Sequence, residues 1–356
     1  MAQADRAKTE VAATDDDGTA EPAEAPARTL LSLLSGAWVA QAIFIAVKLG
    51  IAGILHKGPA SCLELAATTQ AHAPSLHRVL RALASVGLFA NDAEGRFALT
   101  PLADLLRRDA PGTLRAYAIM MGERWVWQSW GDIEHSVRTG QPAFEHVFGA
   151  PLFDDYTAHP NAGRVSADVL NSLSAADNAA IVAAYGFPGS GTVIDVGSRQ
   201  GMLLAAILAA SPGLRGVLFE RPAVLEMARS RLVAAGVGAR CELVGGRLLC
   251  RPSRWWRFVS DEKGDPRLER RGRALILACC RAAMPTTARL LIAEQVMPEG
   301  NQPSTARWLD LLMLVYAGGK ERTEAEYRDL LAAAGFAINR TMPTAATIHV
   351  IEAIPV

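Results

Sequence analysis

The feature that most constrains the fold is a change of periodicity near residue 186. After the turn "GFPGSG" (186–191), the apolar, β-branched segments "TVIDVG", "RGVLFE" and "RCELVGG" alternate with the helical segments "MLLAAILAASP" and "PAVLEMARSRLVAAGV". The alternation continues with a helix around 274–283, the strand "ARLLIAEQVMP", two more helices and a closing strand pair. Such a pattern predicts an α/β fold with a doubly wound, parallel sheet that binds its ligand at the carboxyl ends of the strands.

The first half of the chain has helical periodicity instead. The segment "LLSLLSGAWVAQAIFIAVKLGIAGIL" is apolar on more than one face, as in a helix buried between partners, and it predicts a homodimer. Ser61 and Glu64 have the spacing of a helix capping box, Pro74 begins another helix, and "GLFANDAEGRFALT" predicts strand, turn and strand. Helix, turn, helix and a β-wing together make a winged helix.

We therefore predict four regions. Residues 1–28 form a disordered tail and 29–110 a winged-helix dimerisation domain; 111–185 form a helical linker and substrate-lid region, and 186–356 the cofactor-binding catalytic domain. Nine of the 22 aromatic residues fall in the third region, where core packing explains most of the nine and a flat aromatic ligand could explain a few.

The amino-acid composition argues against several classes of function. Lysine plus arginine and aspartate plus glutamate both number 36, so no overall field draws the chain to nucleic acid or to an anionic membrane. Its five cysteines lack paired spacing, which argues against structural zinc and for a reducing, cytoplasmic location. No cluster of metal-ligating residues is evident, the N-terminus lacks a secretory signal, and the apolar runs are expected to be too short to span a membrane.

The loop "VIDVGSRQG" has the chemistry of a cofactor site. Asp195 ends a buried strand, and Gly197 and Gly201 let the backbone approach a ligand just before a helix begins. Glu220 ends the next strand, 19 residues after Gly201, where a carboxylate can bind both ribose hydroxyls of an adenosine. The G-x-G-x-x-G fingerprint of nicotinamide cofactors is absent, since Ser198 stands in the loop.

Other motifs add a specific resemblance. With this loop and the winged helix, the segments "RLLIAEQVMPEGN", "DLLML", "GGKERTEAEYRDLLAAAGF" and "VIEAIPV" resemble a family of S-adenosylmethionine-dependent O-methyltransferases over about 30–356. The family includes plant phenylpropanoid enzymes and bacterial enzymes that tailor antibiotics. The resemblance implies a class I methyltransferase domain, S-adenosylmethionine as the cofactor, and methyl transfer to a hydroxyl, typically phenolic, of a small aromatic natural product such as a polyketide intermediate.

The resemblance also implies roles for individual residues. Glu294 and Glu321 match two acids that flank and orient a general-base histidine, although a strand end and a helix cap would also explain them. The acceptor pocket would include Met121, Trp125 and Met313, each of which core packing explains as well. The family loop reads DVGGGxG, so Ser198 and Arg199 depart from it; Arg199 could bind the carboxylate of the cofactor or obstruct it.

Two family motifs are missing from the segment between Gly245 and Gly272. Arg247 stands where the family has an aspartate beside the adenine, and Pro266 where it has the general-base histidine. Codons for Arg247-Leu248-Leu249, read one nucleotide later, can encode Asp-Phe-Phe, and codons for Pro266-Arg267-Leu268 can encode His-Asp-Trp. We interpret 247–272, with its seven arginines and two adjacent tryptophans, as a frame-shifted copy of the catalytic segment; a basic insertion is the alternative.

Three functions remain open at this stage. An active O-methyltransferase needs the intact catalytic segment, whereas a cofactor-binding relative without methyl transfer would fit Pro266 as written. A winged-helix DNA-binding regulator is the third, but its second helix offers few groups for DNA, namely His77, Arg78 and Arg81.

Overall fold

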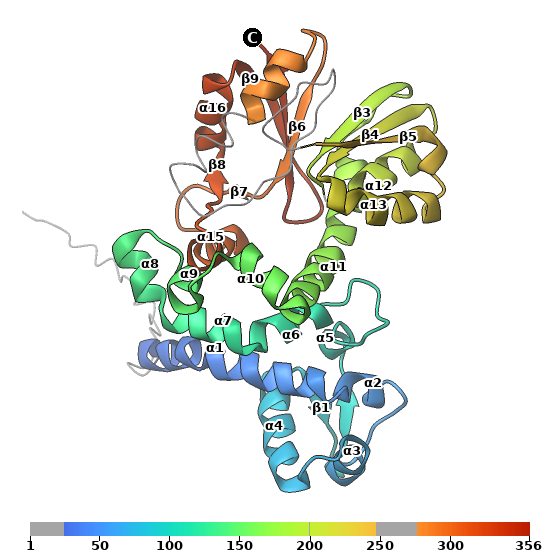
Figure 1. Ribbon diagram of the computed structural model, residues 1–356. Helices are drawn as coiled ribbons and strands as arrows, with labels where there is room; N and C mark the ends of the chain where they lie inside the picture. Colours follow the sequence, from blue (N-terminus) through green and yellow to red (C-terminus); the bar gives the residue numbers. More distant parts are fainter. Residues whose placement is uncertain (1–24, 199, 247–275) are drawn as a thin grey trace, which may run out of the picture.

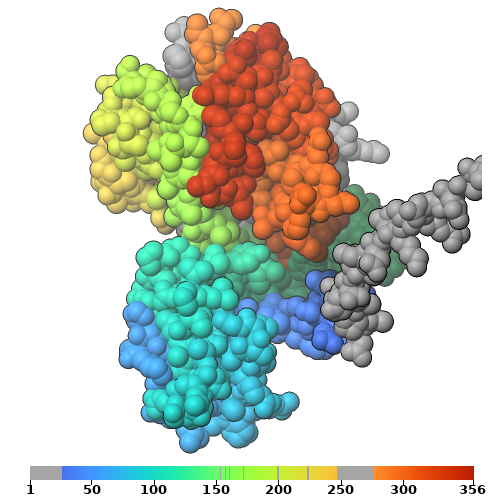
Figure 2. Space-filling view, turned by 180° about the vertical axis from the view of Figure 1, so that it is seen from behind, coloured from blue at the N-terminus to red at the C-terminus, as the bar shows by residue number. Residues whose placement is uncertain are grey.

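The computed structural model describes residues 25–198, 200–246 and 276–356. These residues form a helical N-terminal lobe and a strand-rich C-terminal lobe, joined by further helices (Figures 1 and 2). The site expected at the strand ends therefore belongs to the C-terminal lobe, and the middle helices lie between it and the winged helix.

The N-terminal lobe is the predicted winged helix. Ser61 Oγ accepts a hydrogen bond from the Glu64 amide at 3.3 Å, and the Glu64 carboxylate accepts one from the Ser61 amide at 2.6 Å, so the capping box is confirmed. The two wing strands pair antiparallel with Ala90 opposite Ala98. The elements are α1 (Ala25–Lys48), α2 (Ile51–Leu55), α3 (Cys62–Thr69), α4 (Ala73–Ser85), β1 (Phe89–Asn91), β2 (Phe97–Leu99) and α5 (Pro101–Asp104).

Helix α1 corrects two predictions. It begins at Ala25, so residues 25–28, which were predicted to belong to the disordered tail, are helical; Pro26 is compatible with this because a first-turn proline lacks only an amide that the helix does not use. The run predicted to be too short for a membrane also forms one unbroken helix, and Pro26–Lys48 is long and apolar enough to cross one. Only 11% of its most apolar window is buried, and length and composition alone are weak evidence for a span.

The middle region is helical, as predicted. Its helices are α6 (Arg115–Gly122), α7 (Arg124–Gly131), α8 (Ile133–Thr139), α9 (Ala143–Phe148), α10 (Leu152–Ala158) and α11 (Pro160–Ala184). Helix α6 packs on α1 and on the long α11, while α7 and α9 contact α15 (Thr305–Tyr316) of the C-terminal lobe. The aromatic residues of this region thus lie beside the catalytic half of the chain.

The C-terminal lobe begins with the predicted alternation. Parallel strands β3 (Gly191–Val196), β4 (Leu214–Glu220) and β5 (Cys241–Gly245) pair in chain order, connected by α12 (Met202–Ala210), α13 (Pro222–Ala234) and a short 3₁₀ turn. Asp195 lies opposite Leu218, and Glu220 opposite Gly245, so the carboxyl ends of the three strands meet at one edge.

Three further strands pair antiparallel, in the order β6 (Leu290–Glu294), β10 (His349–Pro355) and β9 (Phe336–Pro343). Residues 276–283 and α16 (Glu324–Ala333) are helical. Two short strands, β7 (Val296–Met297) and β8 (Arg322–Thr323), pair parallel with each other. The closing strand pair predicted from the sequence is the hairpin of β9 and β10, and it turns the chain back, so β10 runs antiparallel to both neighbours.

A cavity of about 720 Å³ lies between β3 and β6. Its lining includes Ile194 of β3 and Leu291 of β6.

A buried glutamate, Glu352 of β10, lies beside this cavity and makes several polar contacts. Glu352 is 2% exposed, accepts a hydrogen bond from the Tyr185 hydroxyl at 2.6 Å, and pairs with Arg340 at 3.2 Å. Burial, together with the hydrogen bond to this carboxylate, raises the pKa of Tyr185 to about 12. Tyr185 ends the helical region, so this contact ties α11 to the sheet.

Candidate functional site

The glycine loop lies where the sequence predicted it, between β3 and α12. Gly197 and Gly201 have φ values of 71° and 66°, a left-handed conformation that side chains rarely adopt. The Gly197 amide bonds to the Phe219 carbonyl at 2.9 Å, which holds the loop against the end of β4. Gly201 directly precedes α12, so the loop presents the positive end of that helix to a ligand.

Asp195 is the most unusual side chain of this site. It is fully buried, and neither carboxylate oxygen has a hydrogen-bond partner among the described residues. An unpaired buried carboxylate costs several kcal/mol, so such a group is normally satisfied by a donor. S-adenosylmethionine carries suitable donors in its ammonium group and ribose hydroxyls. The orphaned carboxylate therefore fits this cofactor.

Glu220 ends the neighbouring strand and is 3% exposed. One of its carboxylate oxygens accepts a hydrogen bond from the Arg221 amide at 2.8 Å, which fixes the side chain at the strand end. The Gly246 amide bonds to the Glu220 carbonyl at 3.1 Å, so the end of β5 is held beside it. The two acids predicted for cofactor binding thus come from adjacent strands, at the edge where parallel strands bind ligands.

Glu294 and Glu321 both lie just before the parallel strand pair β7 and β8. Glu294 ends β6, two residues before Val296, which lies opposite Arg322; Glu321 immediately precedes Arg322. The Glu321 amide donates to Asp310 Oδ1 of α15 at 2.8 Å, so a second carboxylate fixes its backbone. Both acids thus precede the β7–β8 pair along the chain, and their role in orienting a base stays a prediction.

Of the three residues predicted to contact the acceptor, two belong to the same apolar cluster. Met121 of α6 and Trp125 of α7 belong to one apolar cluster around Phe144, whereas Met313 lies half-buried on α15, whose Tyr316 joins that cluster. The Trp125 ring makes edge contacts with other rings of the cluster, and its buried indole nitrogen has no hydrogen-bond partner in the described part of the chain. Those rings are Phe144 at 6.1 Å, Tyr156 at 5.9 Å and Tyr316 at 5.6 Å between centroids.

Three positions of the predicted site lie outside the described residues. They are Arg199 of the glycine loop, Arg247 in the place of the adenine-binding aspartate, and Pro266 in the place of the general base.

Comparison with known proteins identifies the family. A model of the O-methyltransferase dimerisation domain matches residues 31–109, and a model of the O-methyltransferase domain matches 130–253 and 269–337. The chain belongs to this O-methyltransferase family. The fold, S-adenosylmethionine as its cofactor and the enzyme class predicted from the sequence are thereby confirmed.

Individual relatives extend over almost the whole chain. A phenazine O-methyltransferase of Lysobacter antibioticus is 43% identical over 92% of this chain and 96% of its own, and a mitomycin biosynthesis 6-O-methyltransferase of Streptomyces lavendulae is 34% identical over 95% and 97%. The structure of CalO1, a calicheamicin biosynthesis methyltransferase in its S-adenosylhomocysteine-bound form, has a TM-score of 0.83 at 31% identity, over 95% of this chain and all of its own.

The interruption of the domain match is informative. Residues 254–268 are not matched, although the segments on both sides are. This interval contains Pro266, the position of the missing base, and both adjacent tryptophans. The family similarity therefore stops within the segment interpreted as frame-shifted.

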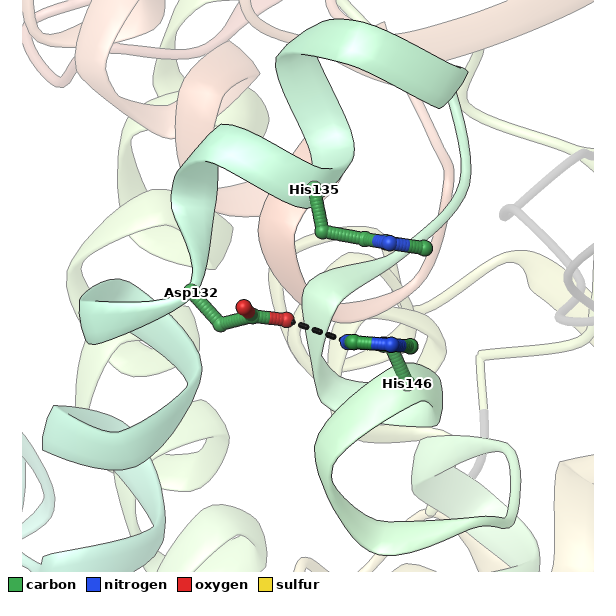
Figure 3. Close-up of side chains that lie close together, drawn as sticks. All are labelled: Asp132, His135 and His146. Atoms are coloured by element: carbon green, nitrogen blue, oxygen red, sulfur yellow. Dashed lines mark hydrogen bonds and ion pairs between the residues drawn. The ribbon is translucent and has the colours of Figure 1, made fainter.

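The sequence analysis also missed a cluster of metal-ligating side chains. Asp132, His135 and His146 place ligand atoms within 4.8 Å of one another, at the junctions of α7, α8 and α9 (Figure 3). Their sequence intervals of three and eleven residues match no familiar metal motif. Only the packing of α8 on α9 brings the two histidines together.

Proposed function

We propose that this protein transfers a methyl group from S-adenosylmethionine to a phenolic hydroxyl of a small aromatic natural product in antibiotic biosynthesis. The single observation that carries the proposal is the fully buried, unpartnered carboxylate of Asp195 beside Glu220, at the carboxyl ends of adjacent strands in a chain of this family. The printed names of the relatives refer to phenazine, mitomycin and calicheamicin, which supports an aromatic or polycyclic acceptor.

In this proposal the described residues hold and orient the reactants. Glu220 binds the ribose hydroxyls, Asp195 accepts from donors of the cofactor, and Gly197 and Gly201 allow close approach of its methionine part. The cofactor supplies a methyl group on a positively charged sulfur. Met121, Trp125 and Met313 form the apolar wall for a planar acceptor, and positioning alone can contribute several kcal/mol.

The remaining requirement is a proton acceptor near the phenol. A phenol has a pKa near 10, so it is mostly protonated at neutral pH and a nearby base speeds its attack. We assign this role to a histidine at position 266, oriented by Glu294 and Glu321. Pro266 as written has no side chain that accepts a proton. The chain as written therefore favours a second candidate function, binding of the cofactor without methyl transfer.

A labelled-methyl assay separates these two functions. The purified chain is incubated with methyl-labelled S-adenosylmethionine and a panel of phenolic phenazines and naphthoates. An active methyltransferase labels the phenolic oxygen and releases S-adenosylhomocysteine in equal amount. Cofactor binding measured by calorimetry, with no labelled product from any acceptor, would establish the second function instead. Absence of cofactor binding would contradict both.

Glu321 provides a test of the orienting role. In a chain with histidine at position 266, Glu321→Gln should lower kcat by about 10-fold or more, because the neutral amide no longer stabilises the protonated imidazole. Cofactor affinity should not change. Steady-state kinetics with Glu324→Gln as the exposed control makes the comparison, since Glu324 pairs with Arg328 on the surface of α16. Equal kcat in both variants would remove Glu321 from the mechanism.

We further propose a homodimer formed through α1. The matched dimerisation domain supports it, as do the large apolar side chains that α1 exposes, including Leu33 at 73% and Trp38 at 76%. The domain division 29–110, 111–185 and 186–356 and a cytoplasmic location belong to the same proposal. Trp38→Glu should convert the dimer to monomer in sedimentation at low micromolar concentration. The exposed Trp308→Glu on α15 serves as a control; a Trp38→Glu protein that remained dimeric would exclude this surface.

A further inference from the structure

The cluster of Asp132, His135 and His146 lies in the helical region away from the glycine loop. Asp132 ends α7 and begins α8, His135 lies in the first turn of α8, and His146 lies on α9. Figure 3 shows the carboxylate directed at the His146 ring and the two imidazoles one above the other. The His146 Nδ1 and Asp132 Oδ2 atoms are 2.6 Å apart. Three ligands thus come from three neighbouring helix ends.

The backbone around the cluster is fixed by a buried contact. The Ser136 hydroxyl accepts a hydrogen bond from the Ala143 amide at 2.8 Å, and Ser136 and Ala143 are 1% and 0% exposed. Since Ser136 follows His135 and Ala143 lies three residues before His146, this contact sets the spacing of the two histidines. The ligands therefore project from a rigid scaffold, as a metal site requires.

The chemistry of the donors specifies the kind of ion. Two imidazoles and one carboxylate form a nitrogen and oxygen set that suits zinc and its first-row neighbours rather than magnesium or calcium. The described cluster leaves a fourth position for water. The side chains of Asp132 and His146 are 33% and 56% exposed, so an ion can enter from solvent.

The present arrangement needs a small adjustment to bind an ion. The three ligand atoms lie within 4.8 Å of one another, whereas two ligands on one zinc ion are about 3.4 Å apart, given bond lengths near 2.1 Å. The imidazole rings are also parallel, with 3.9 Å between centroids and 5° between planes. Because the lone pair of an imidazole lies in its ring plane, one ring must turn; the exposed His146 side chain has the room to do so.

We propose that Asp132, His135 and His146 form a binding site for a zinc-type divalent ion that links α8 to α9. The linked helices both contact α15, and α9 also carries Phe144 of the aromatic cluster. The ion would act structurally there, by fixing one wall of the middle region. This site is separate from the proposed cofactor site, so it does not depend on the proposed function.

Zinc titration of the tag-free, chelator-treated full chain tests the site. Calorimetry should show one zinc ion per chain. His135→Ala and His146→Ala should each weaken zinc binding by about 10- to 100-fold or more, because mutating even a group that hydrogen-bonds to a metal ligand typically lowers metal affinity by that much. The matched control is His159→Ala, because His159 and Asp155 form a similar pair at 3.0 Å that has no third metal-ligating side chain among the described residues. This control should bind zinc as the unaltered chain does.

Two further measurements distinguish loss of zinc binding from loss of the folded structure. Asp132→Asn retains the shape of the side chain and should also lose zinc, while circular dichroism verifies that each variant is folded. Zinc should raise the melting temperature of the unaltered chain and of His159→Ala, but not of His135→Ala. Zinc that stays bound in the histidine variants would be held elsewhere, for example by cysteine thiols, and would overturn the proposal. Absence of saturable binding at 100-fold excess would do the same.

Discussion

A chain in which residues 247–272 are replaced by the sequence read one nucleotide later is expected to transfer methyl groups about 10²- to 10⁴-fold faster than the chain as written. The replacement puts an imidazole at position 266, where Pro266 offers no proton acceptor, and an aspartate at position 247, which the family resemblance implies to be the adenine-binding position. Initial rates of S-adenosylhomocysteine formation with one phenolic acceptor measure the difference.

The control for this comparison is the replaced chain with alanine at position 266. It should lose most of the gained rate while keeping cofactor affinity. Peptide mapping across 241–280 verifies which sequence each preparation contains. Equal turnover of the chain as written and the replaced chain would contradict both the frame-shift interpretation and the assignment of the base.

Replacing Glu220 should have the second largest effect, on cofactor affinity. Each hydrogen bond to a charged group contributes about 1.5–3 kcal/mol, so loss of two ribose contacts in Glu220→Ala should weaken S-adenosylhomocysteine binding by about 10²- to 10⁴-fold. Calorimetric titration measures the dissociation constant. Because Glu220 is buried, Glu220→Gln is the second variant; it keeps the volume and should still weaken binding at least 10-fold.

Glu242 supplies the control for this measurement. It lies exposed on the adjacent strand β5, so Glu242→Ala should leave the dissociation constant unchanged. A folded Glu220→Gln protein with unaltered affinity would show that the ribose binds elsewhere. In that case the assignment of the cofactor site to the ends of β3 and β4 would have to be revised.

Local signals in the sequence predicted local structure well. The Ser61 and Glu64 pair marked a helix start because a capping box is satisfied by residues only three apart. The glycine loop and Glu220 were predicted for the same reason, since strand, turn and helix follow one another along the chain. Periodicity alone also located the wing strands and the closing hairpin.

Features that depend on contacts distant in sequence were not predictable. Periodicity identifies strands but gives neither their register nor their partners, so it could not show that β10 pairs antiparallel with both β6 and β9. The proximity of His135 and His146 depends on how α8 packs against α9. The apolar run of α1 was expected to be too short for a membrane because Lys48, Gly50 and Gly53 interrupt the pattern, but all three lie at or beyond the C-terminal end of this helix.

The contact between Tyr185 and Glu352 has a consequence for how the helical region and the strand-rich lobe move. Tyr185 ends α11, and its hydroxyl donates to a buried carboxylate of β10. Separating the two groups would leave a buried acceptor with one donor fewer, so a displacement of α11 is expected to carry β10 with it. Helix α6, which packs on α11, would follow the same displacement.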